Sequence, residues 1–215
     1  MVAENRLHDL GVIPMTSSDA QGMGRAGETW WRTFALAAVL NPRQGDDDNE
    51  RILRYLAKIT VNPALTHGLA TDLGRLAVGK LADIVLWEPR SFAAKPWLVL
   101  KSGFPAWGVT GDPNASIADA QPLRIAEQFG ALGAAPAELS YLLTNSAAQT
   151  GSRRAITVSG CRTVRNTDMV RHGILGDVRV TPDGSSVTWE GQPLDGAALP
   201  GLPVRQVPIS RLHYW

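Results

Sequence analysis

A single β-type segment followed only by helical patterns is the feature that most limits what this chain can fold into. Residues 11–16 read GVIPMT, an apolar run typical of a short buried strand, which ends at Ser17-Ser18-Asp19. No further β-type run occurs before about residue 74. A lone strand needs neighbouring strands on both edges. We therefore expect this segment to be the last strand–helix unit of a larger α/β barrel whose earlier units are absent.

Three helices are predicted after this strand. The first covers about residues 25–40, where apolar side chains recur at helical spacing. The second covers about residues 50–59. The apolar residues on one face of this second helix are Ile52, Leu56 and Ile59. The third opens at Asn62-Pro63, a helix cap followed by a first-turn proline, and ends near Gly68.

Short β-type runs dominate the rest of the chain. They are residues 82–87, 97–101, 156–159, 177–181 and 186–190. Pro182-Asp183-Gly184 separates the last two runs, and this turn sequence predicts a half-solvated hairpin. We expect two domains: residues 1–74, the barrel remnant, and residues 75–215, a β-rich domain with an irregular middle rich in Ala, Gly and Pro.

Composition and charge exclude several classes of partner. The net charge is +1, and the basic residues are scattered, which argues against nucleic acid. Apolar stretches such as residues 34–40 are too short to span a bilayer, and residues 1–11 lack the pattern of a signal peptide. The single cysteine, Cys161, fits a reducing compartment. We therefore expect a cytoplasmic protein with no membrane or nucleic-acid partner.

Four segments carry a resemblance to a known family. They are LHDLGVIPMTSSDAQGMGRAGE (7–28), YLAKITVNPALTHGL (55–69), VGKLADIVLWEP (78–89) with KPWLVLKSG (95–103), and GDPNASI (111–117). Together they resemble the C-terminal part of the large, nickel-binding alpha subunit of urease, in the amidohydrolase superfamily. The second and third segments are shared by many amidohydrolases, whereas the first and fourth are specific to urease. The resemblance implies an α/β plus β fold: the end of a truncated amidohydrolase TIM-type barrel, then a small β-rich domain.

The resemblance also implies roles for three residues after the predicted strand. Asp19 matches the urease aspartate that ligates one of two nickel ions, a role that suits a carboxylate. From spacing alone, the better interpretation of Asp19 is a cap of the following helix. Gly22 and Met23 match positions that line the urea pocket, Gly22 through its backbone carbonyl. The family usually has alanine at Gly22, so the glycine loosens this loop, and Met23 could instead serve ordinary apolar packing.

Other titratable residues carry weaker predictions. His8 and His67 stand in no two-ligand spacing, and we expect His67 to be structural. Cys161 is likewise expected to be a structural thiol. No catalytic residue is predicted in this chain.

By the same resemblance, the remaining nickel ligands lie upstream of this sequence. They are an HxH pair, a carbamylated lysine and two later histidines, and the general-acid histidine is upstream as well. One ligand of a two-nickel site cannot hold a metal, so the chain alone should not hydrolyse urea.

Three interpretations remain open. The chain is a piece of a split large subunit completed by a separately encoded N-terminal piece, an inactive remnant, or a non-catalytic module that binds urease subunits or an accessory protein. In the first case the other urease subunits are partners, urea is the substrate and nickel the cofactor. We also expect an oligomer, because apolar residues such as Val12 and Trp30 would otherwise be exposed.

Overall fold

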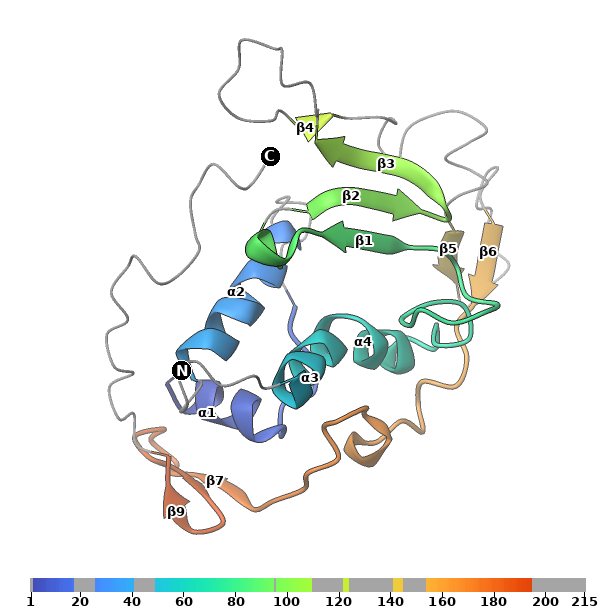
Figure 1. The fold of residues 1–215 in the computed structure, drawn as a ribbon. Helices are drawn as coiled ribbons and strands as arrows, with labels where there is room; N and C mark the ends of the chain where they lie inside the picture. Colours follow the sequence, from blue (N-terminus) through green and yellow to red (C-terminus); the bar gives the residue numbers. More distant parts are fainter. Residues whose placement is uncertain are drawn as a thin grey trace. The chain divides into compact units, whose positions relative to one another are not determined.

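The computed structural model describes residues 2–17, 26–40, 49–94, 96–109, 122–123, 141–144 and 154–194 (Figure 1). These residues form two compact units. The first comprises the described parts of Met1–Leu65 and Val164–Ser210, and the second comprises those of Thr66–Thr163. The predicted domain boundary between residues 74 and 75 stays a prediction. Each unit is a group of residues that lie close together, and this does not show which parts of the chain fold independently.

The first unit contains the helices. They are α1 (Val2–Leu10), α2 (Ala26–Val39), α3 (Asn49–Ile59) and α4 (Val61–Thr66). Helices α2 and α3 confirm the two longer predicted helices to within a residue at each end, and α4 begins one residue before the expected cap. Helix α1 was not predicted, although its sequence VAENRLHDL is rich in strong helix formers.

The predicted strand at residues 11–16 is wrong: this segment forms neither a strand nor a helix in the structure. Its backbone groups pair with helices instead. The Val12 N–H donates to the Leu7 carbonyl at 3.0 Å, and the Thr16 N–H donates to the Lys58 carbonyl at 3.3 Å. A strand is defined by ladder bonds to neighbouring strands, and no strand of the described chain pairs with this segment.

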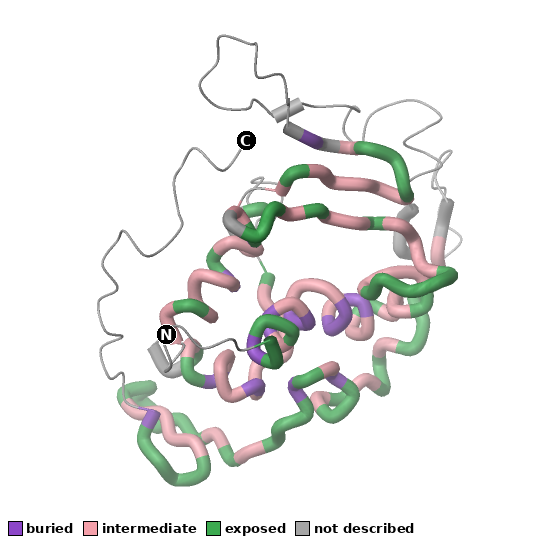
Figure 2. Tube along the Cα trace, in the orientation of Figure 1, coloured by how far each residue is buried: buried purple, intermediate pink, exposed green. Residues whose placement is uncertain are grey.

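The core of the first unit is centred on α3 and α4, whose buried stretches are purple in Figure 2. The largest fully buried side chains are those of Tyr55, Lys58, Asn62 and His172. The buried face of α3 therefore carries Tyr55 and Lys58, with Arg51 one turn earlier. The predicted apolar face is partly wrong, because Ile52 is 42% exposed.

A small three-stranded sheet completes the described part of the first unit. It consists of β7 (Val178–Val180), β8 (Val187–Trp189) and β9 (Gln192–Pro193), and a short 3-10 helix, η2 (Asn166–Asp168), precedes it. Strands β7 and β8 are antiparallel, which confirms the predicted hairpin. The Trp189 ring lies so close to Gly176 that a Cβ there would be 1.9 Å from it.

The second unit is built from β-strands. Strands β1 (Ile84–Trp87), β2 (Pro96–Lys101), β3 (Phe104–Val109) and β4 (Pro122–Leu123) form an antiparallel sheet in that order, with the 3-10 helix η1 (Pro89–Ser91) after β1. Strands β5 (Tyr141–Thr144) and β6 (Arg154–Thr157) form a separate parallel pair. Strand β3 was missed because its sequence FPAWGV contains proline and glycine, which are depleted in strands.

The GKLADIV segment has a structural role in this unit. The Lys80 amine donates to the Thr71 carbonyl at 2.7 Å and also to the Ala70 carbonyl. The Asp83 carboxylate pairs with Lys101 at 2.7 Å and accepts the Ser102 N–H at 2.9 Å. Asp83 thereby fixes the tight turn between β2 and β3. This segment therefore positions the sheet.

Candidate functional site

The residues predicted for the metal and substrate site, Asp19, Gly22 and Met23, lie outside the described residues. The described residues break off after Ser17, two positions before Asp19, and resume at Ala26. Within the described ranges, no group of three or more His, Cys, Asp or Glu side chains could hold a metal ion. The described residues therefore do not fit a nickel centre by themselves. The structure does show how the segment leading to Asp19 is held.

Residues 13–16 are held by side chains and backbone from three helices. The Lys58 amine, on α3, donates to the Ile13 carbonyl, and the Asn62 amide, on α4, donates to the Pro14 carbonyl at 3.0 Å. The Thr16 hydroxyl lies 3.0 Å from that of Thr33 on α2. Because the Lys58 carbonyl accepts the Thr16 N–H, Lys58 binds this segment at both of its ends.

Asn62 also binds a segment more than one hundred residues away in sequence. Its side-chain oxygen accepts the Val170 N–H at 2.8 Å, and its amide nitrogen lies 3.3 Å from the Val170 carbonyl and 3.1 Å from His172 Nδ1. The side chain of Asn62 is fully buried. It therefore ties together α4, residues 13–16 and residues 170–172.

The Nδ1 atom of His172 lies between an acceptor and a donor. It is 2.8 Å from the Val170 carbonyl, which can only accept a hydrogen bond, and 3.1 Å from the Asn62 amide nitrogen, which can only donate one. The other ring nitrogen, Nε2, is buried and has no hydrogen-bond partner among the described residues. Protonation of both ring nitrogens would create a buried cation, which is unfavourable.

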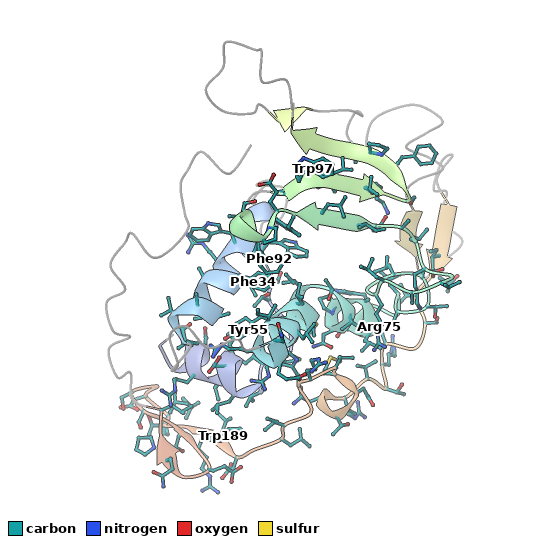
Figure 3. All side chains as sticks on the ribbon, viewed as in Figure 1. Phe34, Tyr55, Arg75, Phe92, Trp97 and Trp189 are labelled. Carbon is teal, nitrogen blue, oxygen red and sulfur yellow. The ribbon has the colours of Figure 1, made fainter. Side chains whose placement is uncertain are left out.

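A second polar network joins α1 to α3 around Asp9. Tyr55 lies on the side of α3 that faces α1 (Figure 3), and its hydroxyl donates to Asp9 Oδ1 at 3.1 Å. Arg51 forms an ion pair with the same carboxylate, and its Nη1 lies 3.4 Å from Oδ2. Arg54 donates to the Asp9 carbonyl at 2.8 Å. Burial, together with Asp9, raises the pKa of Tyr55 above its ordinary value.

Burial lowers the pKa of three basic groups in this unit. The pKa of Lys58 falls from 10.5 to about 7, because desolvation and the nearby Arg54 outweigh the attraction of Asp9. The pKa of His8 falls from 6.5 to about 4 through desolvation, Lys58 and His172. Desolvation also lowers the pKa of His172 to about 4; its bond to Val170 opposes the shift, and Lys58 and Arg54 favour it. Both imidazoles are therefore neutral near pH 7.

We expect acidification to destabilise the first unit through these histidines. Between pH 6.5 and about 4 the unfolded chain protonates His8 and His172 while the folded chain does not. The unfolded state then binds more protons, so the free energy of unfolding falls as the pH falls through this window. Guanidinium unfolding at several pH values measures this slope. His172→Asn keeps a polar group near the Nδ1 position and should flatten the slope.

The control for this prediction is His67→Asn, because His67 is exposed. This variant should keep the slope of the parent chain. A slope that is equally steep in His172→Asn and in the parent would contradict the prediction.

Comparison with known proteins identifies the family to which the chain belongs. Residues 1–122 match the model of the Amidohydrolase family. The chain therefore belongs to the amidohydrolase family. It is 50% identical, over all of its length, to urease subunit alpha 2 of Streptomyces coelicolor and to urease subunit alpha 1 of Streptomyces avermitilis. It is also 42% identical, again over all of its length, to urease subunit alpha of Sulfurisphaera tokodaii.

The chain resembles only a portion of these urease alpha subunits. It covers 39% of the two Streptomyces proteins and 38% of the Sulfurisphaera protein. In the described part of the chain, no helix is long and apolar enough to cross a membrane.

Sequence analysis missed the residues that hold the segment before Asp19. Lys58 and Asn62 lie in the segment YLAKITVNPALTHGL, where Asn62 was interpreted as a helix cap and Lys58 was not considered. One signal was present: Arg51, Tyr55 and Lys58 recur at helical spacing, which places three polar side chains on one face of α3. The contact between Asn62 and His172 arises solely through the tertiary fold.

Proposed function

We propose that this chain is a portion of a urease large subunit. Together with the rest of that subunit it contributes to the hydrolysis of urea to ammonia and carbamate. The observation that carries this proposal is 50% identity across the whole chain to urease alpha subunits of which it covers 39%. Identity at that level over every part of the chain favours a common fold and a common role.

In this proposal, the chain contributes three residues to the urease active site. Asp19 supplies one ligand to a two-nickel centre, and Gly22 and Met23 line the urea pocket. The other ligands come from the part of the large subunit that this chain does not cover. The remaining urease subunits are its partners in a cytoplasmic oligomer.

Completion of the subunit tests the proposal. The chain is produced alone and together with the missing part of the large subunit, in nickel-supplied cells that assemble active urease. Ammonia release and nickel content are then measured on the purified proteins. The chain alone should release no ammonia and should bind nickel with a Kd of about 1 mM or weaker, because a single carboxylate forms no closed coordination site.

The completed complex should contain nickel and hydrolyse urea. An inactive, nickel-free complex that assembles normally would overturn the proposal and favour an inactive remnant or an interaction module. Tight, stoichiometric nickel binding by the chain alone would reveal a ligand set other than the proposed one.

A further inference from the structure

The backbone carbonyls of Ile13 and Pro14 are bound by buried side chains, not by a neighbouring strand. These residues precede Asp19 by six and five positions in the sequence. Pro14 has no N–H and can offer only its carbonyl. The two bonds come from Lys58 and Asn62, both fully buried.

A buried lysine at position 58 would be energetically unfavourable if packing were its only role. A fully buried ammonium group is unfavourable, and a methionine of similar length would fill the space without that penalty. The amine contributes a hydrogen bond to the Ile13 carbonyl, while the backbone carbonyl of the same residue accepts the Thr16 N–H. Lys58 therefore sets both the position and the direction of residues 13–16.

Asn62 connects residues 13–16 to α4 and to residues 170–172. Its amide nitrogen binds the Pro14 carbonyl, while its oxygen accepts the N–H of Val170. A side chain that is bonded on both sides has little freedom to rotate. Residues 13–16 are thereby fixed to α4 and to residues 170–172 together.

We propose that Lys58 and Asn62 are positioning residues for the proposed urease site. They hold the segment that leads to Asp19 so that its carboxylate meets the metal in a defined place. This inference rests on the proposed function. Groups that orient a ligand in this indirect way typically change metal affinity or activity by about 10- to 100-fold when they are removed.

The test uses two variants and a matched control. Lys58→Met removes the bond to Ile13, and relief of the buried ammonium group should offset part of the stability lost with that bond. Asn62→Asp keeps the acceptor for Val170 but removes the donor to Pro14. Asn166→Asp is the control, because it makes the same change at an amide that donates to the Ile174 carbonyl at 3.1 Å, away from residues 13–16.

Two measurements are made on each protein. Amide hydrogen exchange of the chain alone should become faster at residues 12–17 in both variants and stay unchanged in the control. In the completed complex, kcat should fall about 10- to 100-fold, with less nickel bound, in Lys58→Met and Asn62→Asp. A merely structural role would instead lower the stability of the whole unit and raise exchange throughout it, whereas a positioning role raises exchange selectively at residues 12–17.

The outcomes are distinguishable. An inactive wild-type complex would overturn the proposed function, and the positioning role with it. An active wild-type complex whose variants keep the wild-type kcat and nickel content would overturn the positioning role alone. Unchanged exchange at residues 12–17 in both variants would also overturn it, whatever the activity of the complex.

Discussion

Replacing Asp19 by alanine is expected to lower the kcat of the completed enzyme for urea by more than about 100-fold. The change removes a proposed metal ligand, and loss of groups that only support a ligand already reduces activity by about 10- to 100-fold. Nickel content should fall with the activity. The β-sheet of the second unit should be unaffected, because that unit starts at Thr66. Ammonia release, nickel content and circular dichroism measure these three effects.

Asp177→Ala is the control for this variant, since Asp177 lies on the surface and its carboxylate pairs with the exposed Arg179 at 2.6 Å. The control should keep full activity. If the Asp19→Ala enzyme retained its activity, the assignment of Asp19 as a metal ligand would fail.

The second large effect is expected at Asp9. Asp9→Ala should lower the free energy of unfolding of the first unit by about 3 kcal/mol, because it leaves a buried guanidinium without its carboxylate. Arg51 is nearly inaccessible, with 8% of its side chain exposed. The Tyr55 hydroxyl loses its acceptor in the same variant, which adds to the penalty. Guanidinium unfolding followed by tryptophan fluorescence measures the change.

Asp177→Ala again supplies the comparison. Its ion pair is exposed, with 78% of the Arg179 side chain and 49% of the Asp177 side chain accessible, so its loss should change stability by less than about 1 kcal/mol. Equal effects of the two substitutions would show that the Asp9 network does not stabilise the unit.

The helices and the hairpin could be predicted because their signals are local. Apolar spacing in residues 25–40 and the turn at Pro182-Asp183-Gly184 need no distant partner. The segment at residues 11–16 could not be assigned correctly in this way. An apolar run becomes a strand only when other strands lie beside it, and in this structure Lys58 and Asn62 bind its carbonyls instead.

The candidate site was less predictable than the fold. The family resemblance provides Asp19, Gly22 and Met23, all outside the described residues, and those roles stay predictions. The polar face of α3 escaped sequence analysis because burial of Arg51 depends on Asp9, 42 residues earlier. The bond between Asn62 and His172 joins residues 110 apart, and no local pattern shows such a pair.

The link between Asn62 and residues 170–172 has a consequence for the order in which the protein forms during synthesis. The first unit is discontinuous in sequence, and the described part of the second unit is made before Val170 leaves the ribosome. At 5–20 residues per second, the roughly 110 residues that intervene take roughly 5 to 20 s to translate. During that interval residues 13–16 can be held only by the helices made first. The full set of bonds around residues 13–16 therefore forms only after residues 170–172 have been made.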